Sequence, residues 1–223
     1  MLFRSDGSSA GAGLSPDSPL PAARRVVALV PGAEVSVASA ELPTRSAAKA
    51  LQLAPFALEE QLAGDIEELH FATGEVDDAG RTPFVVCERS AMERWLEVLS
   101  AAGLTPALLS PDFLALPDNP GNSVVWLEGG EVAVRHPSQW PVLLDADPLE
   151  DALELAGVLD PATPRHVIAY CTADQAADRE IALGALATRV ASWRTQILVD
   201  GALASLAVSA HHSPPLNLLQ GDY

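Results

Sequence analysis

The sequence predicts an α/β fold, because short apolar runs typical of strands alternate with amphipathic helix-forming segments along the chain. Two bulk properties support this. The chain has 223 residues, which is enough to bury a core. Hydrophobic residues make up 48% and charged residues 19% of it, far from the composition of disordered chains. A folded α/β protein of one large domain or a few lobes is therefore expected.

Charge, cysteine content and hydrophobic segment length indicate which partners and which cellular compartment to expect. With 30 acidic and 13 basic residues the net charge is −17, which repels a phosphate backbone, so no nucleic-acid partner is expected. Cys87 and Cys171 each end an apolar run, which predicts buried, reduced thiols and a cytoplasmic chain. The segment Ile197–Ala210 contains Asp200 and is shorter than the roughly 18 apolar residues of a membrane span, which predicts a soluble fragment.

The first third of the chain opens with a segment unlike the rest. Residues 1–23 are rich in Gly, Ser, Pro and Ala, which predicts a flexible N-terminal segment. Val26–Val30 is a continuous apolar run, typical of a buried strand, and Pro31-Gly32 predicts a turn after it. Glu34–Ala40 alternates in polarity and is expected to be a partner strand.

The stretch Leu42–Phe71 carries the densest helix signal. A helix capped by Thr44 or Ser46 is predicted to run to about Leu53. Pro55 suits the first turn of a new helix, so a second helix is predicted from Pro55 to about Leu69, with His70 at its end as an imidazolium. Gly64 is unfavourable within it. Its apolar residues recur at helical spacing and are expected to face the core: Leu58, Leu62, Ile66 and Leu69.

Acidic residues crowd the same stretch, and no Lys or Arg occurs between Lys49 and Arg81. Two interpretations are open. The acidic residues can form an ordinary solvated helix face, or they can form a docking surface for a basic partner. The candidate partner-binding residues are Glu59, Glu60, Asp65, Glu67 and Glu68.

The remaining elements follow in alternation. The predicted strands are Pro83–Cys87, a hairpin of Val124–Leu127 and Glu131–His136 around Gly129-Gly130, and Arg165–Tyr170. The predicted helices are Ala91–Ala102 capped by Ser90 and ended by Gly103, Asp147 or Asp151 to Leu159, Asp174–Val190, and Leu198–Ala210. The Pro-rich connection at 111–122 is expected to separate two lobes and to hold one helical turn, and residues 211–223 are expected to form an extended arm.

Motifs for catalysis or cofactor binding are missing. Neither a Walker A nor a G-x-G-x-x-G pattern occurs. Asp6-Gly7-Ser8-Ser9 is a weak candidate phosphate loop, because almost no strand precedes it. The five histidines lack zinc-site spacing, and adjacent carboxylates such as Glu59-Glu60 diverge around a helix. We therefore predict no catalytic residues, no metal and no cofactor.

Three ordered blocks of the sequence carry a family resemblance. They are LP…PFALEEQLAGDIEELHFA within 42–72, WLEVLSAAGLTPALLSPDFLALP at 95–117, and the terminal NLLQGDY. Together they resemble the cytoplasmic region of the L protein (GspL) family of the bacterial type II secretion system, over roughly residues 24–223. The resemblance implies an actin-like (RNase H-like) multi-lobed α/β fold, with mixed sheets flanked by helices, related to PilM.

The family resemblance also implies a function and a domain division. It implies a non-enzymatic scaffold at the cytoplasmic face of the cell inner membrane that recruits the secretion ATPase (E protein). It further implies contacts with the M, F and C platform components and coupling to pseudopilus assembly, and it leaves a homodimer open. The actin-like regions would span 24–117 and 118–210, with 211–223 leading to a membrane span. Two alternatives remain: a nucleotide-binding actin-like ATPase, and a PilM-type pilus-assembly adaptor.

Overall fold

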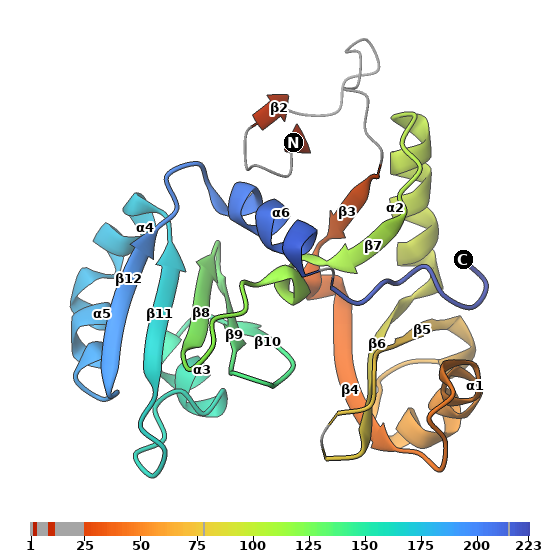
Figure 1. The fold of residues 1–223 in the computed structure, drawn as a ribbon, viewed down its shortest axis with the longest axis horizontal. Coiled ribbons are helices and arrows are strands. Elements are labelled where there is room, and N and C mark those ends of the chain that lie inside the picture. The colour runs from red at the N-terminus through yellow and green to blue at the C-terminus, as the bar shows by residue number, and fades with distance from the viewer. Residues whose placement is uncertain (1, 4–8, 12–24, 78, 214) are drawn as a thin grey trace. The chain divides into compact units, whose positions relative to one another are not determined.

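The computed structural model describes residues 2–3, 9–11, 25–77, 79–213 and 215–223. The chain divides into two compact units (Figure 1). The first unit comprises Leu14–Asp112 and Pro215–Tyr223, and the second comprises Met1–Gly13 and Phe113–Pro214. Both mix strands with helices, as the predicted α/β class requires.

The first unit contains an antiparallel sheet of three strands in the order β4–β6–β5. The strands are β4 (Val35–Glu41), β5 (Leu69–Thr73) and β6 (Arg81–Glu88). The central β6 is buried from Thr82 to Cys87, because it has a strand on either side and apolar residues at most positions. The predicted strand at 83–87 is therefore confirmed. Burial in this strand raises the pKa of the Cys87 thiol to about 12.

Helix α1 (Ala47–Leu58) covers this sheet and corrects the predicted pair of helices. The helix continues through Pro55 and ends three residues later, so the missing N–H of proline falls in the last turn. After the short 3-10 helix η2 (Glu59–Gln61), Leu62 is extended and Gly64 has φ +100°, a left-handed conformation that stops a helix.

The predicted second helix is therefore wrong. A single turn, η3 (Ile66–Glu68), precedes β5, and His70 lies in that strand and not at a helix end. The apolar residues at helical spacing nevertheless face the core, as predicted: Leu58 and Leu69 are buried, and Leu62 and Ile66 pack against the same cluster.

Two parallel strands complete the first unit, β3 (Val27–Val30) and β7 (Leu108–Pro111). The strand predicted at 26–30 is confirmed, but its expected partner is not, because β4 pairs with β6. Helix α2 (Arg89–Ala101) lies between β6 and β7 in the sequence. Its predicted end is confirmed: the Gly103 and Leu104 N–H groups donate to the Ser100 and Leu99 carbonyls at 2.9 and 2.8 Å, which satisfies the last carbonyls. Ser90 does not cap it.

The second unit contains a mixed five-stranded sheet in the order β10–β9–β8–β11–β12. The predicted hairpin is confirmed as β8 (Ser123–Glu128) and β9 (Glu131–Arg135), and the predicted strand at 165–170 as β11 (His166–Cys171). Sequence reasoning missed the two edge strands, β10 (Val142–Asp145) and β12 (Ser192–Ile197). β12 is largely exposed and its sequence, SWRTQI, lacks the apolar pattern of a buried strand. β10 has three apolar residues in VLLD, but it is only four residues long and none of the four is fully buried.

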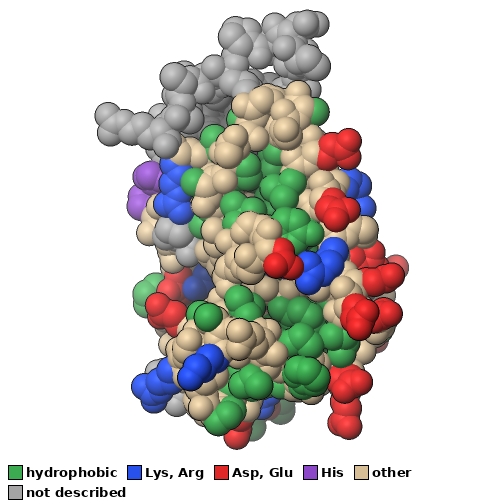
Figure 2. Space-filling view, turned by 90° about the vertical axis from the view of Figure 1, so that its right-hand side faces the viewer, with side chains coloured by type: hydrophobic (Ala, Val, Ile, Leu, Met, Phe, Trp, Pro, Cys, Tyr) green, Lys and Arg blue, Asp and Glu red, His purple; other side chains and the backbone are tan. Residues whose placement is uncertain are grey.

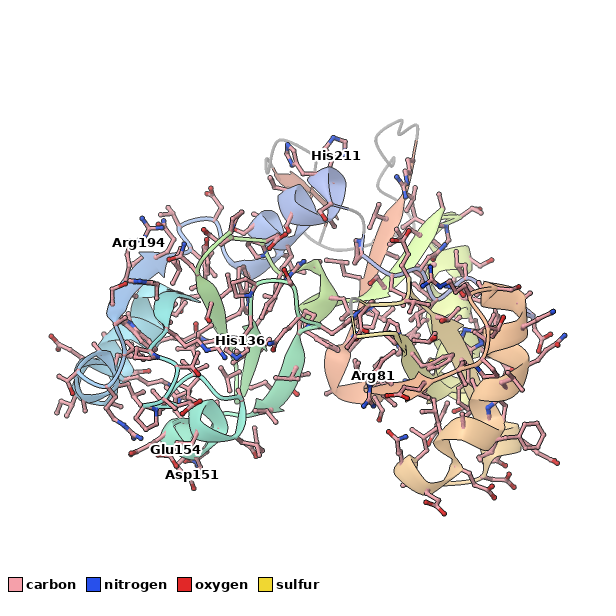
Figure 3. All side chains as sticks on the ribbon, turned by 60° about the horizontal axis from the view of Figure 1, so that its bottom comes forward. Arg81, His136, Asp151, Glu154, Arg194 and His211 are labelled. Atoms are coloured by element: carbon pink, nitrogen blue, oxygen red, sulfur yellow. The ribbon has the colours of Figure 1, made fainter. Side chains whose placement is uncertain are left out.

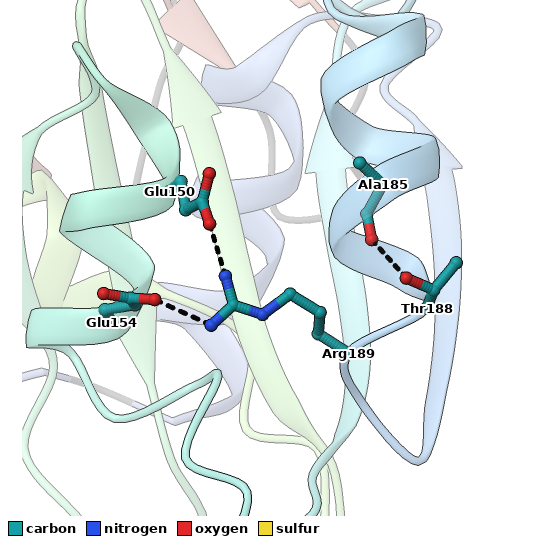
Figure 4. A network of polar contacts seen from close by, with 5 residues as sticks. All are labelled: Glu150, Glu154, Ala185, Thr188 and Arg189. Atoms are coloured by element: carbon teal, nitrogen blue, oxygen red, sulfur yellow. Dashed lines mark hydrogen bonds and ion pairs between the residues drawn. The ribbon is translucent and has the colours of Figure 1, made fainter.

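Helices of the second unit are shorter than predicted. Gly157 at φ 72° follows α3 (Leu149–Leu155). The helix predicted at 174–190 is two helices, α4 (Ala173–Asp178) and α5 (Glu180–Ala187), broken at Arg179. The last helix is α6 (Ala202–His212). The Arg189 guanidinium donates to the Glu150 and Glu154 carboxylates of α3 at 2.5 and 2.7 Å, which joins α3 to the turn after α5 (Figure 4).

The structure also describes parts of the predicted N-terminal segment and C-terminal arm. Of residues 1–23, the structure describes β1 (Leu2–Phe3) and β2 (Ser9–Gly11), which pair antiparallel, whereas most of the candidate phosphate loop lies outside the described residues. The residues described after α6, 213 and 215–223, are not helical, as predicted, and Leu218 among them is fully buried. No helix in the described part of the chain has the length and hydrophobicity to cross a membrane.

Candidate partner-binding groove

A groove of about 700 Å³ lies in the first unit, beside α1 and the edge strand β5. It is lined from three parts of the chain: α1 with the turns that follow it, the start of β5 with Arg89, and the C-terminal residues Gly221 and Asp222. The lining residues belong to one compact unit.

Apolar side chains supply much of the groove wall. Leu51 and Pro55 of α1 and Ile66 of η3 are partly exposed and line it. Phe56, also on the lining, is 80% exposed. Figure 2 shows hydrophobic side chains gathered on this side of the molecule, with Asp and Glu side chains mainly along one edge of the patch and Lys or Arg side chains near the opposite edge. Such a large exposed ring beside a groove marks a candidate anchor for a partner.

Three of the five predicted partner-binding residues line the groove, namely Glu59, Asp65 and Glu67. Glu60 and Glu68 are exposed beside them but are not part of the lining. The turns after α1 place these acids, and the Asp65 carboxylate accepts from the Glu67 N–H at 3.0 Å and so fixes one turn. The broken helix thus separates the acidic residues into a groove-lining set and a neighbouring set.

Arg89 is the one basic side chain among the described residues of the lining. Its guanidinium donates to the Asp222 carboxylate at 2.9 Å and to the Glu67 backbone carbonyl at 3.3 Å. Asp222 therefore neutralises the guanidinium, and three further carboxylates leave the groove negative. Arg89 and Asp222 are site residues that sequence reasoning missed, because they are 133 positions apart.

His70 forms part of the groove floor and is only 3% exposed. Its Nε2 lies 2.7 Å from the Leu218 carbonyl, which can only accept, so Nε2 carries the proton. Burial lowers the pKa of His70; the Leu218 bond and Asp222 oppose this, and Arg89 adds to it. The predicted imidazolium is therefore replaced by a neutral ring, which meets the Tyr223 ring edge-on at 4.9 Å.

The second buried histidine of the described residues, His136, lies in a polar cluster of its own. In the second unit, His136 Nε2 donates to the Ala156 carbonyl and Nδ1 accepts from the Ser123 hydroxyl, both at 2.7 Å (Figure 3). Both side chains are buried, so a substrate cannot reach them. No group of His, Cys, Asp and Glu side chains in the described residues is arranged to hold a metal ion.

Comparison with known sequences gives a consistent result. The family model described as "Type II secretion system (T2SS), protein L" matches residues 16–223. The chain is 38% identical to type II secretion system protein L of Pseudomonas aeruginosa over 127 residues, covering 53% of this chain and 33% of that protein. It is 32% identical to the protein of the same description from Pectobacterium carotovorum, over 87% of this chain and 43% of that protein. The chain spans less than half the length of these curated relatives.

Solved structures agree on the fold. The cytoplasmic domain of EpsL, an inner membrane component of the type II secretion system of Vibrio cholerae, has a TM-score of 0.69 at 22% identity and covers 90% of this chain and 79% of its own. The PilM–PilN type IV pilus biogenesis complex gives 0.56 at 14% identity, covering 86% and 80%. A Bacteroides thetaiotaomicron protein with an actin-like ATPase fold gives 0.50 at 10% identity, covering 83% and 74%. The predicted actin-like, PilM-related fold is confirmed.

Proposed function

Because the chain belongs to the type II secretion system protein L family, we propose that it is a cytoplasmic scaffold domain that recruits the secretion ATPase, the E protein, to the inner membrane. It does so without catalysis of its own. Through contacts with the M, F and C platform components, the full-length protein would couple the ATPase to pseudopilus assembly and protein export.

The observation that carries the proposal is the composition of the groove. An exposed Phe56 and an apolar wall stand beside the carboxylates of Glu59, Asp65 and Glu67. This combination fits a basic protein segment that carries an apolar anchor, because the anchor provides the affinity and the charges guide association. A nucleic acid does not fit, since its phosphate backbone is anionic.

The charges predict how binding depends on salt. Exposed carboxylates attract a basic partner over about 10 Å at 0.1 M salt, and over only about 3 Å at 1 M. The apolar contact with Phe56 does not weaken in this way. Binding of the partner is therefore expected to become weaker, but not to vanish, as salt increases.

Isothermal calorimetry of the 223-residue chain against the purified cognate ATPase, at low and high salt, tests the proposal. The double variant Glu59→Gln/Glu67→Gln is expected to weaken binding about tenfold at low salt. The matched control is Glu60→Gln/Glu68→Gln, which removes the same charge from neighbouring exposed positions outside the groove. A second pair is Phe56→Ala, expected to weaken binding about thirtyfold at either salt, and Leu155→Ala, an exposed leucine of the second unit.

Each outcome has a distinct meaning. Failure of the unmodified chain to bind would overturn the recruitment role. Equal losses for the two glutamate pairs would mean that overall charge matters and the groove does not. A parallel titration with ATP and Mg²⁺ tests the alternative of a nucleotide-binding ATPase, for which saturable micromolar binding is required.

A further inference from the structure

The last seven residues, Asn217–Tyr223, form a strap across the edges of both sheets of the first unit. At the β7 edge, the Leu218 N–H donates to the Leu109 carbonyl at 2.7 Å, and the Leu109 N–H donates to Asn217 Oδ1 at 2.9 Å. At the β5 edge, His70 Nε2 donates to the Leu218 carbonyl, and Leu218 is completely buried. The strap thus occupies positions that an additional strand would otherwise take.

Gln220 is the clamp of the strap on β5. Its Oε1 accepts from the Thr73 N–H at 3.2 Å, and its Nε2 donates to the Thr73 carbonyl at 3.1 Å. One side-chain amide therefore satisfies both backbone groups of a single edge residue, as a neighbouring strand would. Nε2 also donates to the Asn217 carbonyl at 2.8 Å, so the clamp holds the strap's own turn as well.

The residues that follow the clamp belong to the groove. Gly221 and Asp222 line it, and Asp222 holds the Arg89 guanidinium. If the strap detaches from β5 and β7, the groove loses one wall and the Asp222 carboxylate. Arg89 then faces the groove without its ionic partner. Both changes disfavour a basic, apolar-anchored segment: the first removes contact area and the second adds a repulsive charge.

We propose that the strap is a functional part of the docking surface, so that the groove accepts its basic partner only when Gln220 clamps the strap to β5. The inference rests on the proposed function, because it concerns occupancy of the same groove. A partner that binds only when the strap contacts β5 must, by thermodynamic linkage, also stabilise that contact. The measured association constant is the intrinsic constant multiplied by the fraction of molecules in which the strap contacts β5.

The decisive variant is Gln220→Ala, because Gln220 does not line the groove. We expect it to increase amide hydrogen exchange at Thr73 and Leu218 in the free protein and to weaken ATPase binding about fivefold or more. Gln196→Ala is the matched control, since it makes the same chemical change at an exposed position of β12. It is expected to leave exchange at Thr73 and Leu218, and affinity, unchanged.

A second set of variants tests whether neutralisation of Arg89 by Asp222 favours binding, and it leaves the Gln220 clamp unchanged. Asp222→Ala should weaken binding, because it unmasks Arg89, and Arg89→Ala/Asp222→Ala should recover part of the lost affinity. If the double variant recovers no affinity, an unpaired Arg89 does not repel the partner, and this part of the inference is wrong. Circular dichroism of each variant verifies folding.

The outcomes separate this inference from the proposed function. If Gln220→Ala releases the strap but binds as tightly as the unmodified chain, the strap is not part of the docking surface and recruitment stands. Unchanged exchange at Thr73 and Leu218 would overturn the clamp itself. No binding by the unmodified chain would overturn recruitment and, with it, the coupling to the strap.

Discussion

At the scale of single residues, the two buried histidines show how the fold decides ionisation. His136 donates from Nε2 to the Ala156 carbonyl and accepts at Nδ1 from Ser123, so its partners fit the neutral ring. Burial lowers the pKa of His136; the Ala156 bond opposes this, and Arg165 adds to it. The folded chain therefore binds a proton at this site less readily than the unfolded chain.

This lowered pKa predicts a loss of stability in mild acid. The contribution is fully present above the unfolded pKa of about 6.5 and is lost as pH falls toward the folded pKa. His136→Gln should reduce the slope of unfolding free energy against pH, by at most about 1.4 kcal/mol per pH unit. Urea denaturation between pH 8 and 5.5 measures it, and a slope equal to that of the unmodified chain would contradict the prediction.

At the scale of elements, the stretch after α1 shows why a helix pattern produced turns and a strand. The spacing of Leu58, Leu62, Ile66 and Leu69 fits a helix, but the same residues reach the core by a different path. Gly64 adopts φ +100°, where a residue with a Cβ is strained, so the chain leaves the helical path there.

Gly64→Ala should therefore destabilise the first unit by about 1 kcal/mol. The cost comes from the backbone alone, because a Cβ at this position would meet no atom within 4 Å. Gly184→Ala in α5 is the matched control: it also has open space but no positive φ, and should stabilise its helix by up to about 1 kcal/mol. Urea unfolding of both variants measures the difference, and a neutral Gly64→Ala would refute the strained turn.

At the scale of the whole molecule, the net charge of −17 is the dominant electrostatic property. Repulsion among the carboxylates destabilises the compact state, and salt screens it. Most ion pairs of the described residues, such as Arg189 with Glu150, are exposed and contribute little that salt could remove.

The melting temperature should therefore rise when NaCl increases from 0.05 to 0.5 M. A gain of about 1 kcal/mol corresponds to roughly 2–4 °C for a chain of this size. Differential scanning calorimetry measures the change, and a neutral osmolyte at matched osmolality controls for effects that are not ionic. A constant or lower melting temperature would show that attractive pairs outweigh the repulsion.

Sequence reasoning succeeded where the information is local or periodic. The strands at 26–30 and 83–87, the hairpin around Gly129-Gly130 and the helix end at Gly103 depend on short-range patterns, and the structure confirms them. The predicted burial holds for 83–87, whereas only Val30 of the first run is fully buried. The edge strands β10 and β12 were missed, because one edge of each lacks a strand partner. The side chains of β12 are largely exposed and show no apolar signature, and the apolar run of β10 is only three residues long.

The α/β class, the acidic character of residues 59–68 and the core-facing positions of Leu58, Leu62, Ile66 and Leu69 follow from the sequence alone, because composition and side-chain periodicity are properties of the chain. Which acids line the groove depends on the turns that follow α1 in the folded chain. The neutral state of His70, the clamp of Gln220 on β5 and the place of Asp222 in the groove likewise require the tertiary structure. These features join residues more than 130 positions apart in the sequence, such as Arg89 and Asp222. No local pattern encodes such contacts, since they form only when both sheets have folded and left their edges open to the strap.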